Sequence, residues 1–458
     1  MHGDDCRAQL SSYRDHVIRN SRNVISRCIA VQVRDAPRDR RKWGFHSPSV
    51  VSLAMVVVAT FTLMPFYIDA FASPSHTASS SASGLHFEGL NGDRYGVRTA
   101  IRVLSFKGSQ YSLAVDLANH QIDGGLETPS AMCRSTVGCV AAVNGDYYDV
   151  TRKGHADPGD EVGGIIQDCV LLHTPEVSHQ QANLDGQRVN GGLDWSVRVD
   201  NLGVTVPITG VNQELPMKYA NVNLPLTGIL LFTAPFNLRT PSAAGRITYE
   251  FTQVNNTTIS TTTTTTSTTS STSTSTSTST STIPFISPPA SPTTINASTE
   301  LELVAQTTNA VRVKAGHVDI SAPTGSSFAS LQVGDTVTMT TTSTAGCNNI
   351  GGHPMLLNDG VVVPISAADT YMAQKYARTV IGWTASGETV IMIVAGTDDR
   401  SGATGLQLVR LLQSLHVVTA LNLDGGDSTA LYVNGRVLYH AGRGERRVST
   451  GLLVVQNP

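Results

Sequence analysis

The stretch Val417-Val418-Thr419-Ala420-Leu421-Asn422-Leu423-Asp424-Gly425-Gly426-Asp427-Ser428 joins an apolar run to a polar cluster. Its first half is rich in β-branched and apolar residues, which predicts a buried strand. The strand ends in Asn422, Asp424, Gly425, Gly426 and Asp427. Adjacent glycines let a ligand approach the backbone, so amide, carboxylate and N–H groups could converge there on one small volume. The alternative is an ordinary Asp-Gly turn between two strands.

The segments on either side extend this pattern. Ala430 to Tyr439 reads as a hairpin with Asn434-Gly435 at its turn. Upstream, Thr404 to Gln407 has capping-box spacing, and Leu406, Val409, Leu412 and Leu415 recur on one face of a helix. The continuous apolar run 389–394 predicts a buried central strand. The expected order is therefore strand, helix, strand, site and hairpin.

Alternating apolar runs predict strands through most of the remaining sequence. They begin near Leu85, continue to about Thr252 and resume at Leu301, and helix is the minority element. We expect a single α+β domain over residues 85–458, with extensive mixed or antiparallel β-sheet and few helices.

The N-terminal region carries features of export. Residues 1–47 hold ten Arg or Lys against five Asp, and no charged residue occurs from Val50 to Ile68. A helix of that length matches the bilayer core, and the basic flank predicts a cytoplasmic N-terminus. Residues 48–72 are then a transmembrane anchor, or a signal segment cleaved after Ala72. Residues 73–84 would form a flexible stalk, and the domain would lie outside the cell membrane or be secreted.

Charge and cysteine usage fit an extracytoplasmic domain. The formal net charge of −3 indicates no nucleic-acid partner. Beyond the apolar segment there are four cysteines, which allow three disulfide pairings. The short spacing of Cys133 and Cys139 favours a local pair, leaving Cys169 with Cys347. No paired CxxC motif is present, which argues against a zinc site.

Between residues 255 and 298 the composition collapses to Thr, Ser and Pro. Such a tract cannot bury enough apolar area to offset its ordering entropy, so we expect it to be disordered. It interrupts the domain as an insertion or links two domains, and periodicity does not decide between these.

Further polar clusters follow apolar runs elsewhere in the chain. Val140 to Val143 leads into Asn144, Asp146, Tyr147 and Tyr148. The two tyrosine rings could stack on a sugar or simply pack in the core. The glycine pairs Gly163-Gly164 and Gly351-Gly352 would bring backbone close to a ligand.

Arg378 interrupts an apolar segment. Its planar guanidinium suits a phosphate or carboxylate, and a structural ion pair is the alternative.

The order of these clusters resembles the phosphodiester glycosidase family. The resemblance rests on motifs from about Leu85 to Val455: Asn144-Gly145-Asp146-Tyr147-Tyr148, Gly351-Gly352-His353-Pro354-Met355-Leu356, Asn358-Asp359-Gly360, Arg378-Thr379-Val380-Ile381-Gly382, Asn422-Leu423-Asp424-Gly425-Gly426 and Glu445-Arg446-Arg447-Val448-Ser449. It implies hydrolysis of a glycosidic bond to phosphate, in a single α+β domain into which the Thr/Ser tract at 255–298 is inserted. By the resemblance, Arg378 would hold the phosphodiester, and Asn144 and Asp424 would surround the reacting carbon. The glycine pairs would bring backbone N–H groups to the substrate oxygens.

The chain also departs from the family pattern. Asp146 stands where the family commonly has a second Gly, Asp427 replaces a third Gly, and Ala395-Gly396 replaces an Asp-Gly. The added carboxylates would repel an anionic substrate unless a cation neutralises them, so a divalent cation is possible.

The sequence thus predicts an exported glycoside hydrolase acting on a phosphate-linked or anionic glycan. Asp424 is the favoured nucleophile or base. A catalytically inactive carbohydrate-binding surface protein is the rival, and a structural surface protein is a third possibility.

Overall fold

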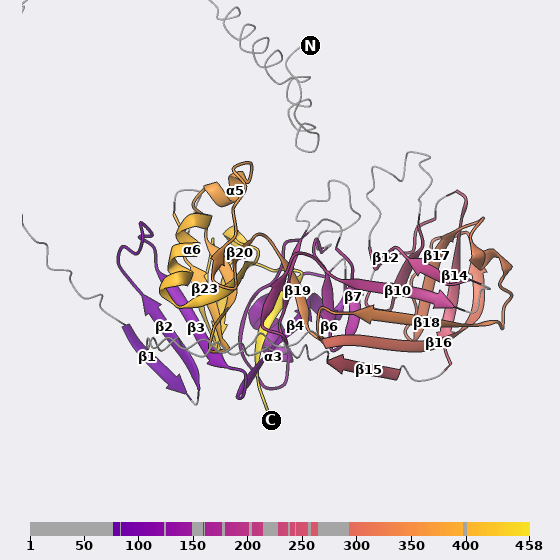
Figure 1. Ribbon diagram of the computed structural model, residues 1–458, viewed down its shortest axis with the longest axis horizontal. Helices are drawn as coiled ribbons and strands as arrows, with labels where there is room; N and C mark the ends of the chain where they lie inside the picture. Colours follow the sequence, from indigo (N-terminus) through magenta and orange to yellow (C-terminus); the bar gives the residue numbers. More distant parts are fainter. Residues whose placement is uncertain are drawn as a thin grey trace, which may run out of the picture. The chain divides into compact units, whose positions relative to one another are not determined.

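The protein is built mainly of β-strands, as the alternating runs of its sequence predict (Figure 1). The computed structural model describes residues 77–82, 84–122, 125–148, 159, 161–175, 179–200, 204–213, 228–236, 239–242, 244–254, 258–263, 293–396 and 401–458. Within these ranges no helix is long and apolar enough to span a membrane. The cytoplasmic segment 1–47 and the anchor or signal segment 48–72 that we predicted lie outside them.

An eight-stranded antiparallel sheet carries the polar end of the decisive stretch. Its strands, in spatial order, are β1 (Thr77–Ala82), β2 (Leu85–Leu90), β3 (Ile101–Lys107), β23 (Glu388–Val394), β22 (Arg378–Thr384), β24 (Val417–Asn422), β20 (Met355–Asn358) and β21 (Val361–Val362). The predicted buried run forms β23, near the middle of this sheet, where every residue from Thr389 to Val394 is buried.

Two five-stranded antiparallel sheets supply the other polar clusters. One is ordered β26 (Arg436–His440), β25 (Ala430–Val433), β5 (Cys139–Asn144), β27 (Thr450–Gln456) and β4 (Tyr111–Leu117). The other is ordered β7 (Val170–His173), β6 (Ile165–Gln167), β19 (Asn349–Gly352), β8 (Gln180–Asn183) and β9 (Arg188–Asn190). The predicted hairpin turn is present: Asn434 and Gly435 have φ of 46° and 85°, the positive values that a type I′ turn requires.

A nine-stranded sheet forms the remainder. It contains β11 (Val206–Ile208), β10 (Trp195–Asp200), β18 (Thr336–Ser343), β16 (Thr293–Thr307), β14 (Arg246–Gln253), β17 (His317–Pro323), β13 (Leu230–Thr233) and β12 (Gly210–Val211), with β15 (Thr258–Thr263) paired to β16. Only β12 and β13 pair in parallel among the described strands, so the predicted mixed or antiparallel sheet is confirmed.

One large core joins side chains of the three sheets that carry the clusters. It contains Trp383, Ile393 and Leu421 of the eight-stranded sheet, together with Val143 and Ile350 of the two five-stranded sheets. A second hydrophobic core consists mainly of side chains from the nine-stranded sheet. The ends of β5, β19 and β24 are therefore anchored to one packed interior, which positions the polar residues that follow them.

Both predicted disulfides are present. Cys133 pairs with Cys139 across helix α3 (Pro129–Ser135) and the start of β5. Cys169 pairs with Cys347, 178 residues away, and ties the β6–β7 turn to the segment before β19.

Two segments expected to lack structure contain strands. Part of the predicted stalk forms β1, and the two ends of the Thr/Ser tract form β15 and the start of β16. Thr is β-branched and fits an extended strand, and an adjacent strand with free backbone groups supplies the hydrogen bonds. Residues 264–292 lie outside the described ranges.

Helix α6 (Gly405–Ser414) packs on the eight-stranded sheet, beside β20 and β24 (Figure 1). Its capping box between Thr404 and Gln407 is present as predicted. The predicted apolar face is wrong at Leu406, which is 64% exposed, whereas Leu408 and Leu412 are fully buried. Steps of three residues drift about 60° around a helix, so a face read from Leu406 leaves the core.

Truncation of Leu412 should be far more costly than truncation of Leu406. Leu412→Ala is expected to lower the free energy of unfolding by about 2–5 kcal/mol because it opens a cavity. Leu406→Ala should change it by less than about 0.5 kcal/mol because that side chain is solvated. Urea denaturation of the two variants measures the difference, and equal losses would contradict this helix face.

Candidate functional site

The polar clusters meet at one edge of the eight-stranded sheet. β22 and β24 are antiparallel with Val380 opposite Asn422, so the start of β22 at Arg378 lies beside the end of β24. The backbone of His353, just after β19, donates to Asn422 O at 2.9 Å. Asp424 N donates to Gly145 O, just after β5, at 3.1 Å. Four segments separated by up to nearly three hundred residues therefore converge.

Asn144 is fully buried and joins these segments through its amide. Nδ2 donates to Asp424 O at 2.7 Å, and Oδ1 accepts from Thr379 Oγ1 at 2.6 Å and from Ala430 N at 3.3 Å. An amide that makes these bonds has little capacity left for a substrate. Asn144 lies beside Asp424 as predicted. Its side chain links β22, β25 and the loop of Asp424 through hydrogen bonds.

Asp424 is the titratable carboxylate at the centre of this edge. Its Oδ1 accepts from Gly425 N at 2.8 Å. Burial is the main cause that raises its pKa to about 6, and the charge of Asp146 acts in the same direction. A hydrogen bond from Ser428 and the positive charge of Arg446 oppose the rise. A carboxyl group with this pKa can change protonation state near neutral pH, which suits acid or base catalysis.

Arg378 is fully buried and bound by the protein itself. Its guanidinium donates to the carbonyl oxygens of Ala403, Tyr371 and Gln374 at 3.1, 2.6 and 3.0 Å. The rings of Tyr371 and Tyr376 lie 4.2 and 5.4 Å from its central carbon. This geometry differs from the expected phosphate-holding role, because a substrate would have to displace several of these contacts.

Arg446 is a second cation whose charge acts on this edge. It is half-buried, and its charge lowers the pKa of Asp424. The preceding Glu445 accepts from Ser130 N at 2.8 Å at the start of α3, which fixes the loop. Sequence reasoning included Arg446 within the family motif Glu445-Arg446-Arg447 but assigned it no role.

The two glycine pairs, which were expected to bring backbone close to a ligand, lie against other parts of the chain. A Cβ at Gly163 or Gly351 would lie 1.9 or 2.0 Å from Asp146 Oδ2, so these two glycines make room for a carboxylate of the chain. A Cβ at Gly352 would lie 2.6 Å from Asn422 O, and one at Gly164 2.7 Å from a Leu193 methyl group. Close contacts within the chain therefore account for all four.

The turn after Asp424 is likewise internally bonded. Gly426 N donates to Ala377 O at 2.9 Å, and a Cβ at Gly425 would lie 2.6 Å from both Ala377 O and Tyr371 Oη. The N–H groups of Gly425 and Gly426 are therefore engaged rather than open to a ligand. Asp427 is exposed at the same turn.

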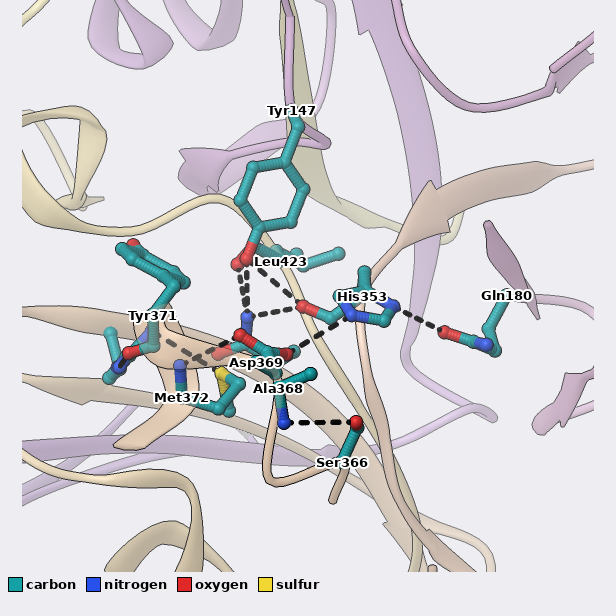
Figure 2. Close-up of polar contacts among 11 residues, drawn as sticks. Tyr147, Gln180, His353, Ser366, Ala368, Asp369, Tyr371, Met372 and Leu423 are labelled. Atoms are coloured by element: carbon teal, nitrogen blue, oxygen red, sulfur yellow. Dashed lines mark hydrogen bonds and ion pairs between the residues drawn. The ribbon is translucent and has the colours of Figure 1, made fainter. Parts of the chain in front are cut away.

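Tyr147 and Asn422 share a hydrogen-bond network with the loop after β19 (Figure 2). Tyr147 Oη donates to His353 O at 3.0 Å and accepts from Asn422 Nδ2 at 2.9 Å. The His353 ring lies between Gln180 Oε1 and Asp369 Oδ2, each 3.2 Å away. Asn422 Oδ1 is buried without a hydrogen-bond partner. Burial raises the pKa of the Tyr147 hydroxyl, which stays protonated and acts as a donor.

Other predicted groups have different outcomes. Tyr148, considered with Tyr147 as a sugar platform, is buried and donates to Arg447 O at 2.9 Å. Within the described ranges no group of three or more His, Cys, Asp or Glu side chains is placed to hold a metal ion. Asp398 and Asp399, which follow Ala395-Gly396, lie outside those ranges.

The comparisons with known proteins agree with this arrangement. Residues 290–455 match the model of the phosphodiester glycosidase family. This segment contains Arg378, Asn422, Asp424 and Arg446, whereas Asn144 and Asp146 precede it. No curated protein matches the sequence.

Solved structures show the same fold. A hypothetical protein from Synechocystis has a TM-score of 0.58 at 18% identity, over 84% of this chain and 64% of that one. This chain thus spans less than two thirds of that relative. A putative exported protein from Burkholderia pseudomallei has a TM-score of 0.52 at 16% identity, over 78% and 74%. The catalytic domain of zebrafish N-acetylglucosamine-1-phosphodiester α-N-acetylglucosaminidase has a TM-score of 0.37 at 14% identity, over 84% of this chain and 89% of that one.

Replacement of Arg378 should affect stability, and replacement of Arg446 should not. Arg378→Met leaves three carbonyl groups without their donor, each costing about 1–3 kcal/mol, so we expect a loss of at least about 3 kcal/mol. Arg446→Met should change the free energy of unfolding by less than about 1 kcal/mol. Urea denaturation tests both. An unchanged free energy of unfolding in Arg378→Met would contradict the structural role of this guanidinium.

The fit between Asp146 and Gly351 can be tested with a double-mutant cycle. Gly351→Ala should destabilise by about 1–3 kcal/mol because its methyl group overlaps the carboxylate. In an Asp146→Gly background the same change should cost less, since the nearest atom is gone. Gly325→Ala, where a methyl group meets nothing within 4 Å, is the control. Additive losses would argue against this fit.

Proposed function

We propose that the protein is an exported glycoside hydrolase that cleaves a sugar from a phosphate-linked glycan. The observation that carries the proposal is Asp424: a carboxyl group with a pKa of about 6, beside the cationic Arg446, within the segment that matches the phosphodiester glycosidase family. The family match supports the class of reaction, and the site chemistry supports the residue.

In this proposal Asp424 acts at the anomeric carbon as nucleophile or base. A phosphate is a good leaving group, so the bond from carbon to phosphate oxygen can break with the electron pair passing to that oxygen, with less need for acid assistance. Arg446 would hold the anionic phosphate through charge-assisted hydrogen bonds. Tyr147 and Asn422 would form the wall of the sugar site.

Charge balance is the main constraint on substrate binding. Asp146, Asp424 and Asp427 add three carboxyl groups, and Arg378 is enclosed by carbonyl oxygens and tyrosine rings. A divalent cation that accompanies the substrate remains part of the proposal, since oxygen ligands suit Mg²⁺ or Ca²⁺.

Export is supported by the two disulfides, because disulfides persist in oxidising compartments. Membrane attachment through residues 48–72, or secretion after cleavage at Ala72, is proposed from the sequence alone.

A glycan-binding protein without turnover is the second candidate. The observation in its favour is that Arg378, the residue expected to hold the phosphodiester, has its guanidinium engaged by the chain. The Ala395-Gly396 departure from the family pattern points the same way.

Hydrolysis of a chromogenic sugar phosphodiester by the purified domain is the decisive measurement. Turnover should fall at least about 10²-fold in Asp424→Asn, which removes the ionisable group. It should be unchanged in Asp335→Asn, because Asp335 is exposed in the turn just before β18 of the nine-stranded sheet. Glycan binding with no turnover in the wild type, with or without divalent cations, would favour the second candidate.

The pH dependence gives an independent check on Asp424. If its ionised form reacts, activity should rise as the pH passes upward through about 6. The sign for stability is opposite: because the folded pKa is raised above the unfolded value of 3.8, the wild type loses stability as the pH rises from about 4 through 6. Asp424→Asn should therefore be more stable than the wild type at pH 7, and the two should converge near pH 3.5 in thermal melts.

A further inference from the structure

The buried carboxylate of Asp146 is not explained by the function proposed above. Its side chain is 1% exposed. Oδ1 accepts from Tyr147 N at 2.7 Å, whereas Oδ2 is buried without a hydrogen-bond partner. A buried carboxylate is costly unless it is paired. The chain nevertheless accommodates it by placing Gly163 and Gly351 against Oδ2, which indicates a built feature.

His179 is the group placed to use this carboxylate. Its Nδ1 lies 3.5 Å from Asp146 Oδ1, and its side chain is 13% exposed. The ring meets that of Tyr147 edge-on, at 5.7 Å between centroids, and stacks on His353 at 5.7 Å with 17° between planes. The imidazole thus lies at ion-pair distance from a carboxylate, without a hydrogen bond between them, and contacts two other aromatic rings.

This arrangement has a chemical consequence. A carboxylate on the Nδ1 side favours the tautomer with a proton on Nδ1, which leaves the lone pair on Nε2. Orienting the ring in this way is a role of the carboxylate in an Asp–His pair of a hydrolase.

The pair belongs to the same site as Asp424. The charge of Asp146 raises the pKa of Asp424, and the charges of both carboxylates raise the pKa of Tyr147. Tyr147 contacts the His179 ring and is hydrogen-bonded to Asn422, two residues before Asp424. Among the described residues, the titratable groups in contact with His179 are Asp146, Tyr147 and His353, and Asp369 pairs with the far nitrogen of His353.

We propose that His179 is the base that accepts the proton of the attacking water, with Asp146 as its positioning residue. This inference rests on the proposed hydrolase function and assigns the nucleophile role to Asp424. Asp424 first bonds to the anomeric carbon while the phosphomonoester leaves with the bond's electron pair. Water then forms a new bond from its oxygen to that carbon, its proton passes to Nε2 of His179, and the bond to Asp424 breaks. The proton is finally released to solvent, so the products are the free sugar and the phosphomonoester.

The test compares turnover of the chromogenic sugar phosphodiester in variants of the same domain. His179→Gln should lower kcat by about 10²-fold or more with little change in KM, and Asp146→Asn should lower kcat by about 10-fold. His317→Gln is the matched control, because His317 is a partly buried histidine whose Nδ1 lies 2.9 Å from a carboxylate oxygen of Glu250 in the nine-stranded sheet. Its activity should equal that of the wild type.

Two further measurements distinguish a catalytic role of His179 from a structural one: a burst of phosphomonoester and rescue by added imidazole. In His179→Gln, the phosphomonoester should appear as a burst of about one equivalent before the slow steady state, because only the water step is impaired. In His179→Gly, added imidazole should restore at least about 10-fold of the lost rate, an effect that a purely structural role does not produce.

Two failures are distinguishable. If the wild type turns over and Asp424→Asn abolishes activity, yet His179→Gln keeps full kcat or shows neither burst nor imidazole rescue, the role of His179 is refuted and the hydrolase function stands. If the wild type gives no turnover, both fail together.

Discussion

The amide of Asn144 is the interaction on which the site depends. It lies at the end of one five-stranded sheet and bonds to Thr379 in the eight-stranded sheet, to Ala430 at the start of the following hairpin and to the backbone of Asp424. No apolar side chain could take its place, because an amide is needed to satisfy a hydroxyl, an N–H and a carbonyl group at once. Strand pairing sets the direction of each segment, and this amide sets their separation at the point where the strands end.

The charged side chains near Asn144 differ in how far the chain encloses them. The guanidinium of Arg378 is enclosed by carbonyl oxygens and tyrosine rings. It places a positive charge near the site while its own donors are bonded to the chain. Asp146 lies against Gly163 and Gly351 and beside His179. The raised pKa of Asp424 follows from burial and from this acidic neighbour, opposed by Arg446 and Ser428. The surrounding chain therefore controls the ionisation of Asp424.

Much of this arrangement could be predicted from local patterns. The capping box at Thr404, the positive φ angles at Asn434-Gly435 and the buried run 389–394 are local properties, and each forms the predicted element. The convergence of Asn144 with Asp424 was also predictable from the order of the motifs. Burial was not, because it depends on which segments pack together. For the same reason the sequence did not show that Arg378 is enclosed by the chain, and it placed Leu406 rather than Leu408 in the core.

The pairing of β15 with β16 has a consequence for the Thr/Ser tract. Thr263 and Thr293 are direct cross-strand partners, so the chain leaves the sheet and returns to it at neighbouring backbone positions. The number of residues between them does not enter the register of any described strand, and the entropy of closing a loop grows only slowly with its length. This point is consequently a natural place for repeat expansion or contraction between otherwise equivalent chains, and for the insertion of a reporter module without disturbance of the site.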